Sequence, residues 1–453
     1  MTKDTKERVQ EERKPVDPDA DEHISFGHVV AALATMLFSH FILYYLFMSL
    51  YMYDGALFVP WYDINKHWKF AEENFVPTKE TWTVYLAYIL MEAVFAYILP
   101  GFIVKGLPIP SNGGKQLTYN CNGFASWWCT KAVVIALHYF EILPFTWIAA
   151  NIMPLITTMI VFSDILSIFV YVVPFFIGTT MRMTGSHIYD FFMGSSLNPR
   201  LGSLDIKMWA ETRVSWITLF LLTFSAAMEQ YRQLGTVTPP MIFMCATHWL
   251  YSNACHKGEE MITTTWDIFH EKYGWMLCYW NLAGVPLMYC WNSFYILKNP
   301  HAVGPVWIGV MFTTLLVTYY FWDTTNSQKN AFRMMERGTY KERSALICPK
   351  MPYKYVKFET AKYIKTKHGN KILIDGWYKY ARKLHYTCDI IFALLWGLAC
   401  GYDHYLPYWY CTFFTGMIIH RAVRDNEKCA AKYGKDWDDY KKAVPYVFIP
   451  WII

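Results

Sequence analysis

The stretch "YLPYWYCTFFTGMIIHRAVRDNEKCAAKY", residues 405–433, decides the class of fold. Its first half is apolar enough to lie in a membrane, whereas its second half carries polar groups in a regular order. The ordered side chains are Arg421, Asp425, Cys429, Lys432 and Tyr433. Side chains four residues apart lie on the same face of a helix. The stretch therefore predicts a helix that leaves a lipid bilayer and carries one polar stripe.

The composition also indicates an integral membrane protein. Of the 453 residues, 54% are hydrophobic and 17% are charged, whereas soluble domains contain roughly 25% charged residues. Aromatic residues make up 19% of the chain, which is typical where rings line a membrane interface or an apolar pocket. The cysteines are scattered without the spacing of a metal site, so we predict buried thiols in a reducing compartment and no metal. No nucleic-acid partner is expected.

Ten segments are expected to cross the bilayer, because a spanning helix needs roughly 20 apolar residues. They lie near 25–52, 82–104, 131–151, 153–178, 214–231, 240–256, 274–297, 302–322, 386–403 and 405–420. The third and fourth segments are separated only by "NIMP" and the last two only by "GYDHYLP", so each pair is expected to form a tight helical hairpin. The predicted fold is an all-α polytopic membrane protein of about ten transmembrane helices.

The charges in the loops predict which side of the membrane each loop faces. Residues 325–385 contain fifteen Lys and Arg against four Asp and Glu, whereas residues 53–81 contain three Lys against five acidic residues. Because cytosolic loops carry an excess of Lys and Arg, the basic segment is expected in the cytosol. An even number of spans then places both termini there.

These signals divide the chain into four parts. Residues 1–24 predict a disordered cytosolic tail, because they are charged and lack an apolar core. Spans one to eight occupy 25–322, a basic cytosolic segment occupies 323–385, and 386–453 hold the last two spans and a C-terminal helix. Within the basic segment, "KYIKTKHGNKILIDGW" predicts a short β-hairpin that turns at His368, Gly369 and Asn370.

Three stretches place cations beside aromatic rings on the predicted cytosolic side. They are "DTTNSQKNAFR" with Lys329 and Arg333, "DGWYKYARKLHYTCD" with Trp377, Tyr378, Arg382, His385 and Tyr386, and the stripe of 421–433. Each stretch alone is typical of a membrane flank, an aromatic anchor or, for Arg421 and Asp425, an intrahelical ion pair. Together they favour one anionic, aromatic ligand such as a nicotinamide dinucleotide phosphate. The chain has no GxGxxG or Walker loop.

Acidic residues near the spans are candidates for proton transfer. In "EEMITTTWDIFHEKYG", residues 259–274, Glu260, Asp267 and His270 follow at intervals of seven and three, so a continuous helix would place them on one face. A general acid beside an apolar pocket could come from this segment. Asp389 lies in the first turn of a predicted span, where a charge is costly and indicates function.

Six stretches carry a resemblance to a known family. They are "LNPRLGSLDIKMWAETRVSW", "DTTNSQKNAFRMMERG", "DGWYKYARKLHY", "GYDHYLPYWY", "HRAVRDNEKCAAKYGKDWDDY" and "VPYVFIPWII". In this order they resemble the membrane-bound, NADPH-dependent sterol reductases. The resemblance implies ten transmembrane helices of the endoplasmic reticulum membrane, a cytosolic cofactor pocket in the C-terminal half and a sterol cavity open to the bilayer. It is strongest to the fungal branch that reduces the 24(28) side-chain bond in the last step of ergosterol synthesis.

The resemblance also implies cofactor contacts. With the cationic stretches, the predicted NADPH-binding residues are Lys329, Arg333, Leu373, Trp377, Tyr378, Arg382, His385, Tyr386, Arg421, Asp425, Cys429, Lys432, Tyr433 and Tyr440. The chain departs from the family in two places. Many relatives have Trp at the position of Tyr378, and several have Asn at the position of His385.

The expected reaction begins with a proton, because an isolated carbon–carbon double bond offers a hydride no electrophilic carbon. The candidate acids are Glu260, Asp267 and Tyr386. The expected partners are a sterol and the bilayer, and the sequence does not identify a protein partner. The alternatives are reduction of a ring bond at position 7 or 14, a membrane methyltransferase of the prenylcysteine type, which has a similar C-terminal pattern, and a non-catalytic sterol-binding protein.

Overall fold

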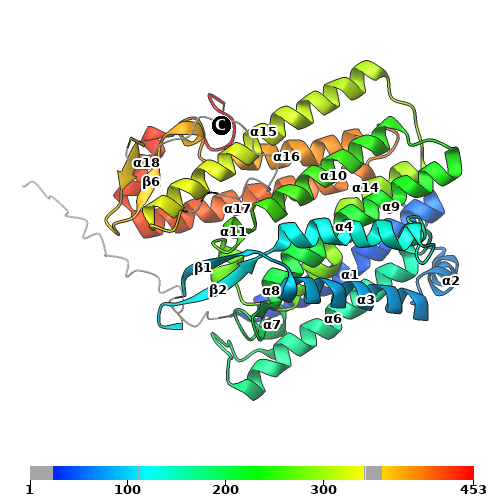
Figure 1. Cartoon of the computed structure of the whole chain (residues 1–453), viewed down its shortest axis with the longest axis horizontal. Coiled ribbons are helices and arrows are strands. Elements are labelled where there is room, and N and C mark those ends of the chain that lie inside the picture. The colour runs from blue at the N-terminus through cyan, green and yellow to red at the C-terminus, as the bar shows by residue number, and fades with distance from the viewer. Residues whose placement is uncertain (1–23, 110–111, 341, 343–359, 453) are drawn as a thin grey trace, which may run out of the picture.

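The computed structural model describes residues 24–109, 112–340, 342 and 360–452. Most of the predicted tail, 1–24, and part of the basic segment, 343–359, therefore lie outside the described residues. The described part is mainly helical, and its long helices run alongside one another in an elongated bundle (Figure 1). This architecture confirms the predicted helical class.

The N-terminal half contains α1 (Phe26–Tyr53), α2 (Ile64–Asn74), α3 (Lys79–Ile98), α4 (Gly123–Tyr139), α5 (Trp147–Ala150), α6 (Ile152–Ile177), α7 (His187–Met193), α8 (Ile206–Trp209), the π-helical η2 (Ala210–Ser215) and α9 (Trp216–Leu234). The C-terminal half contains α10 (Pro239–Lys257), α11 (Glu259–Ile262), α12 (Trp266–Phe269), α13 (Trp275–Tyr279), the π-helical η3 (Trp280–Gly284), α14 (Val285–Lys298), α15 (Pro305–Glu336), the 3₁₀ turns η4 (Gly376–Lys379) and η5 (Leu406–Tyr408), α16 (Leu384–Leu398), α17 (Trp409–Tyr433) and α18 (Lys435–Ala443).

Among the described residues, four helices are long and apolar enough to cross a membrane, namely α1, α3, α6 and α15. The other predicted spans coincide with helices that are shorter, more polar or interrupted by a π-helical turn. These four helices support the membrane character of the chain by their length and composition, whereas the number of ten spans stays a prediction.

Of the two predicted helical hairpins, one is confirmed and one is wrong. Helices α16 and α17 pack against each other across the short turn η5. By contrast, α4 already ends at Tyr139, so the break at Asn151 separates the short α5 from α6 and does not join two spanning helices, and Pro154 lies in the first turn of α6. A proline is tolerated there, since the first N–H groups of a helix have no intrahelical partner.

Three antiparallel two-stranded hairpins complete the described part of the fold. The predicted hairpin is confirmed, with β5 (Tyr363–Lys365) paired to β6 (Lys371–Leu373) and Gly369 at φ +83° in its turn. The strands β3 (Arg200–Leu201) and β4 (Leu204–Asp205) form a second, very short hairpin. The largest, β1 (Phe102–Ile109) with β2 (Lys115–Cys121), was not predicted, although the Asn-Gly-Gly sequence at 112–114 is a turn signal.

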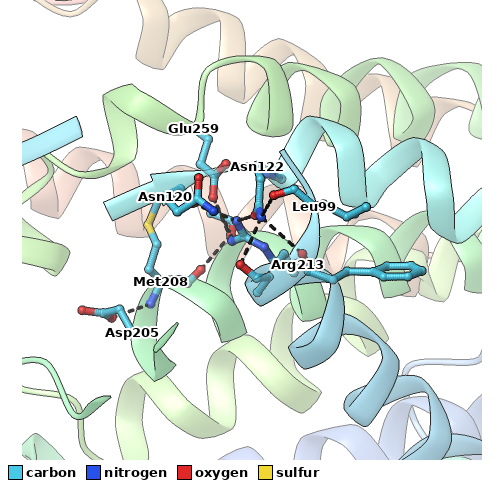
Figure 2. A network of polar contacts seen from close by, with 11 residues as sticks. Leu99, Asn120, Asn122, Asp205, Met208, Arg213 and Glu259 are labelled. Atoms are coloured by element: carbon cyan, nitrogen blue, oxygen red, sulfur yellow. Dashed lines mark hydrogen bonds and ion pairs between the residues drawn. The ribbon is translucent and has the colours of Figure 1, made fainter. Parts of the chain in front are cut away.

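A buried ion pair fixes the place where α3, β2, η2 and α11 meet (Figure 2). Arg213 Nη1 lies 2.8 Å from Glu259 Oε1, and the two side chains are 3% and 2% exposed. Arg213 also donates to the side chain of Asn122 and, at 3.3 Å, to the carbonyl of Asn120. The amide of Asn122 in turn donates to three carbonyls at the C-terminal end of α3. One guanidinium group thus joins four elements.

We expect the substitution Arg213→Met to destabilise the protein strongly, because it leaves the carboxylate of Glu259 buried without its cation. Removing one partner of a buried ion pair costs about 3–5 kcal/mol. Thermal unfolding in detergent should show a clearly lower midpoint. Lys442→Met is the control, since Lys442 forms an exposed pair with Asp439 at 3.8 Å, and an equal loss in both variants would contradict the role of Arg213.

Candidate functional site

The last turns of α15 and α17 lie near α18 and the β5–β6 hairpin (Figure 1). Side chains from these elements line a pocket. Both α15 and α17 continue without a break from an apolar first part into a polar second part. The polar parts therefore extend beyond the bundle and lie beside each other. This is the continuous helix with a polar stripe that residues 405–433 predict.

The inner part of the pocket has a volume of about 210 Å³. It is lined by Lys329, Phe332, Arg333, Ile372, Leu373, Tyr378, Arg382, Lys383, Asp425, Cys429, Tyr433, Trp437 and Tyr440. The outer part, about 620 Å³, is lined by Arg333, Glu336, Arg337, His368, Gly369, Asn370, Lys432 and Tyr433. The two parts share Arg333 and Tyr433, so they form one continuous site. The structure thus brings together most of the residues that the sequence proposed for one ligand.

Four of the proposed residues lie outside this lining. The ring of Trp377 packs on α15, with its centroid 5.0 Å from that of Phe321. His385 and Tyr386 lie side by side at the start of α16, with ring centroids 4.5 Å apart. The fourth residue, Arg421, lies two turns before Cys429 on α17 and bonds to a different element.

The polar groups of the pocket favour an anionic ligand. Cationic side chains outnumber the acidic ones in the lining, and the two acids are already paired. Asp425 accepts a hydrogen bond from Lys383, and Glu336 lies 3.1 Å from Arg333. A surplus of guanidinium and ammonium groups remains, and such groups bind phosphate through charge-assisted hydrogen bonds.

The thiol of Cys429 is protonated. Burial raises its pKa to about 11, and the charge of Asp425 adds to this effect. Burial likewise raises the pKa of the Tyr440 hydroxyl. These two groups therefore offer neutral hydrogen-bond donors to a ligand. A protonated thiol is also a poor nucleophile, because the thiolate is the reactive form of cysteine.

Two buried nitrogen atoms in this region have no hydrogen-bond partner within the described part of the chain, namely Arg382 Nε in the pocket lining and His385 Nδ1 at the start of α16, outside the lining. Orphaned buried polar atoms are costly unless a ligand or water satisfies them. Tyr378 adds a buried ring, and Lys329 Nζ lies 5.8 Å from its centroid. Cations, unsatisfied nitrogen atoms and aromatic surfaces together fit a dinucleotide phosphate.

The intrahelical ion pair between Arg421 and Asp425 is not formed. Arg421 Nη2 instead lies 3.3 Å from Asp267 Oδ2 on α12, and Asp425 pairs with Lys383. Each side chain thus binds a partner on another element, which an i, i+4 spacing cannot reveal. The charged residues of the stripe therefore bind α17 to α12 and to the segment before α16, and they do not pair within α17.

The candidate acids do not share one helical face, so that premise is wrong. Glu260 lies on α11 and Asp267 on α12, and three threonines separate these short helices. The hydroxyl groups of Thr263, Thr264 and Thr265 donate to carbonyls three residues earlier, which competes with helix continuation. The nearby His270 is neutral, because burial and surrounding cations lower its pKa to about 4.

Some lining residues were not predicted from the sequence. They are Phe332, Glu336, Arg337, His368, Gly369, Asn370, Ile372, Lys383 and Trp437. Several directly neighbour predicted residues, and His368, Gly369 and Asn370 form the predicted hairpin turn. Lys383 and Trp437 could have been found from the sequence, because they lie inside the stretches "YKYARKLHY" and "GKDWDDY", which also contain predicted site residues.

Comparison with known proteins gives a consistent result over nearly the whole chain. A family model described as the ergosterol biosynthesis ERG4/ERG24 family matches residues 20–453. The chain is 41% identical over 442 residues to a Delta(24(24(1)))-sterol reductase of Aspergillus fumigatus, covering 95% of this chain and 93% of the relative. It is 40% identical over 450 residues to a Delta(24(24(1)))-sterol reductase of Gibberella zeae, covering 96% and 74%. A Delta(14)-sterol reductase of Dictyostelium discoideum is 36% identical over 382 residues, covering 83% and 79%.

We expect Gly376→Ala to disorganise the pocket. Gly376 has φ +60°, and an added Cβ would lie 2.0 Å from Gln328 Nε2. Gln328 accepts the N–H of Trp377 at 2.8 Å, so the clash would displace the turn that carries Tyr378. Gly369→Ala is the control, because its φ is +83° and its added Cβ meets open space. Thermal unfolding should show a larger decrease of the midpoint for Gly376→Ala than for Gly369→Ala. Equal decreases would mean that the positive φ angle, and not the clash with Gln328, causes the loss of stability.

Proposed function

The chain belongs to the ERG4/ERG24 ergosterol biosynthesis family, and on that basis we propose that it is a membrane-bound reductase of a sterol side-chain double bond. The bond is the one at C24(28), and its reduction completes the ergosterol skeleton. The observation that carries this choice is the identity of 40–41% to two relatives named Delta(24(24(1)))-sterol reductases, against 36% to a Delta(14)-sterol reductase.

The cofactor that fits the pocket is NADPH. The cations Arg333, Arg337 and Lys432 surround the wide outer part, where a phosphate-bearing group would lie. The narrower inner part offers Tyr378, Trp437 and Tyr440 as ring surfaces for flat heterocycles. When bound, NADPH supplies the hydride that an oxidoreductase of this kind requires.

The remaining chemistry falls to the side chains of the protein. An unactivated alkene must receive a proton before it can accept a hydride, so the protein has to hold an acid beside the terminal methylene carbon. Protonation there leaves a tertiary cation at C24, which water would capture. The aromatic interior around Tyr251, Trp322 and Trp396 excludes water from such a cation. Glu260, Asp267 and Tyr386 are the acids that the sequence suggests.

The topology follows from the same proposal. The pocket is lined largely by the basic segment and by the polar end of α17, and both carry the charge expected of cytosolic regions. We therefore place the pocket and both termini in the cytosol and the bundle in the endoplasmic reticulum membrane. NADPH enters from the cytosol, whereas the sterol enters from the bilayer.

A ring reductase acting on the Δ14 bond is the second candidate, because Delta(14)-sterol reductases also cover most of the chain. Sterol profiling of cells that lack the protein separates the two. Accumulation of a sterol with a 24(28) double bond supports the side-chain activity, and accumulation of a Δ14 sterol overturns it.

For the cofactor, we expect Lys329→Ala and Arg333→Ala to weaken NADPH binding without unfolding the protein. Each change removes a cation from the inner pocket, and a hydrogen bond to a charged group contributes roughly 1.5–3 kcal/mol, or about 10–150-fold in affinity. Fluorescence titration with NADPH measures the effect. Lys365→Ala is the control, because Lys365 is exposed on β5 outside the pocket lining. Unchanged titrations for both pocket variants would remove these residues from the site.

For the reaction, membranes that contain the protein should reduce a 24(28)-methylene sterol in the presence of NADPH. Deuterium from the nicotinamide should appear at C24, and deuterium from the solvent should appear on the former methylene carbon, because the proton adds first to the terminal carbon. Mass spectrometry and NMR of the product locate both labels. The reverse arrangement of the labels would exclude the proposed order of steps.

A further inference from the structure

The stretch "LNPRLGSLDIKMWAETRVSW", residues 197–216, contains charged side chains that the proposed function does not yet use. Most of them have a clear structural partner. Arg200 lies 3.2 Å from Asp205, and Arg213 forms the buried pair with Glu259. Lys207 Nζ donates to the carbonyls of three residues of the 267–271 segment, at 2.7, 3.0 and 2.8 Å.

Glu211 differs from the other charged residues of this stretch. Its half-buried carboxyl group has no ion pair or hydrogen bond with any described residue. A half-buried carboxyl group without a partner is unfavourable in a well-packed interior unless it serves a ligand or carries a proton. The position therefore calls for a functional explanation.

The backbone around Glu211 is also unusual. It lies in η2, a π-helical turn, and η2 packs against η3, a second π-helical turn. Such turns are rare and often occur at functional sites. On the facing turn, Asn281 is 6% exposed, and its Nδ2 has no hydrogen-bond partner among the described residues. An unsatisfied amide and a carboxyl group without an ion pair thus lie on two packed π-helical turns.

The surroundings of Glu211 link it to the cofactor helix. Burial raises the pKa of Glu211 to about 8, the negative charge of Asp267 adds to this shift, and Lys207 and Arg421 oppose it. Burial lowers the pKa of Arg421, but Asp267, Tyr386 and Glu211 together raise it above its ordinary value. Arg421 on α17 therefore lies among acidic groups from several elements.

Asp267 is already held in another contact. Its carboxylate lies 3.3 Å from the guanidinium of Arg421, whereas Glu211 has no cation in contact among the described residues. The same cluster thus holds one carboxyl group that fixes Arg421 and a second carboxyl group that is not used in an ion pair.

We propose that Glu211 is the acid that protonates the sterol alkene, an assignment that depends on the proposed reductase function. In this step the O–H bond of Glu211 breaks and a C–H bond forms at the terminal methylene carbon, which leaves the cation at C24. Hydride from NADPH then completes the reduction, and NADP⁺ is the oxidised product. The carboxylate of Glu211 then recovers a proton from water.

The pH dependence follows from the groups around Glu211. The charged groups near Glu211 are Lys207 and Asp205 on its own segment, Asp267 on α12 and Arg421 on α17. On α10, the hydroxyl group of Tyr251 and the thiol of Cys255 also interact electrostatically with Glu211. On the other packed helices, Glu92 accepts from Thr130, and Lys131 lies over the rings of Trp127 and Trp128. Because the protonated form is the donor, turnover should fall as the pH rises through about 8.

The test compares Glu211→Gln with Glu211→Asp and with the control Glu73→Gln, since Glu73 is an exposed acid on α2. In membranes that contain NADPH and a 24(28)-methylene sterol, Glu211→Gln should lower kcat by at least about 100-fold, the usual contribution of a general acid. NADPH titration and the unfolding midpoint should stay unchanged. Glu211→Asp should retain part of the activity with a shifted alkaline limb, and Glu73→Gln should retain nearly all of it. Turnover by Glu211→Gln close to the wild-type value, or an equal loss in Glu73→Gln, would overturn the assignment.

A second measurement does not depend on turnover. Infrared difference spectra between pH 6 and pH 10 should show absorption of protonated carboxyl groups in the wild-type protein, and one band of this absorption should be missing in Glu211→Gln. Loss of this band supports the proposal even where another double bond proves to be the substrate. An identical band in the variant shows that Glu211 is ionised and overturns it. Failure of the reductase function itself would be seen separately. The wild-type protein would then not reduce the sterol, whereas the infrared difference between the wild-type protein and Glu211→Gln would remain.

Discussion

A charge inside an apolar bundle needs an opposite charge, and the arrangement of this protein follows from that requirement. Burying an ion costs several kcal/mol unless a well-placed partner offsets it. Arg213 pairs with Glu259, and Lys257 lies 2.6 Å from Asp323 with both side chains at most 6% exposed. The first pair joins η2 to α11 and the second joins α10 to α15, so each links helices that are distant in the chain. The pairs select one relative position of helices that apolar contacts alone would allow to slide.

The pocket depends on the same bundle, because it is built from helices that continue beyond it. The bundle holds the apolar parts of α15 and α17 in place, and their polar ends then line the site. The C-terminal segment closes back on this site, since the carbonyls of Tyr446 and Val447 accept the N–H groups of Arg382 and Lys383 at 3.0 and 2.7 Å. Contacts with other elements on each side therefore fix the positions of the charged side chains along 421–433.

The sequence predicted those features that depend on local periodicity. The four-residue spacing of the stripe, the β5–β6 hairpin and the α16–α17 turn all follow from interactions between near neighbours, and the structure contains each of them. The helix break at Thr263–Thr265 was missed because threonine hydroxyls compete with the backbone only where the fold gives the helix no support. The ion pair between Arg421 and Asp267 spans 154 positions, and no local pattern encodes such a contact. The β1–β2 hairpin was missed because an apolar run at its start resembled the end of a helix.

The position of Arg421 explains how one helix serves two tasks. Toward the C-terminal end of α17, Asp425, Cys429 and Tyr433 face the pocket proposed for the cofactor. One turn earlier, Arg421 turns toward Asp267 and the electrostatic reach of Glu211. A movement of α17 on cofactor binding would therefore change the distance between a cation and the proposed acid, and a nearer cation makes a carboxyl group a stronger proton donor. The stripe thus places the pocket proposed for the cofactor and a cation near the proposed acid on the same helix.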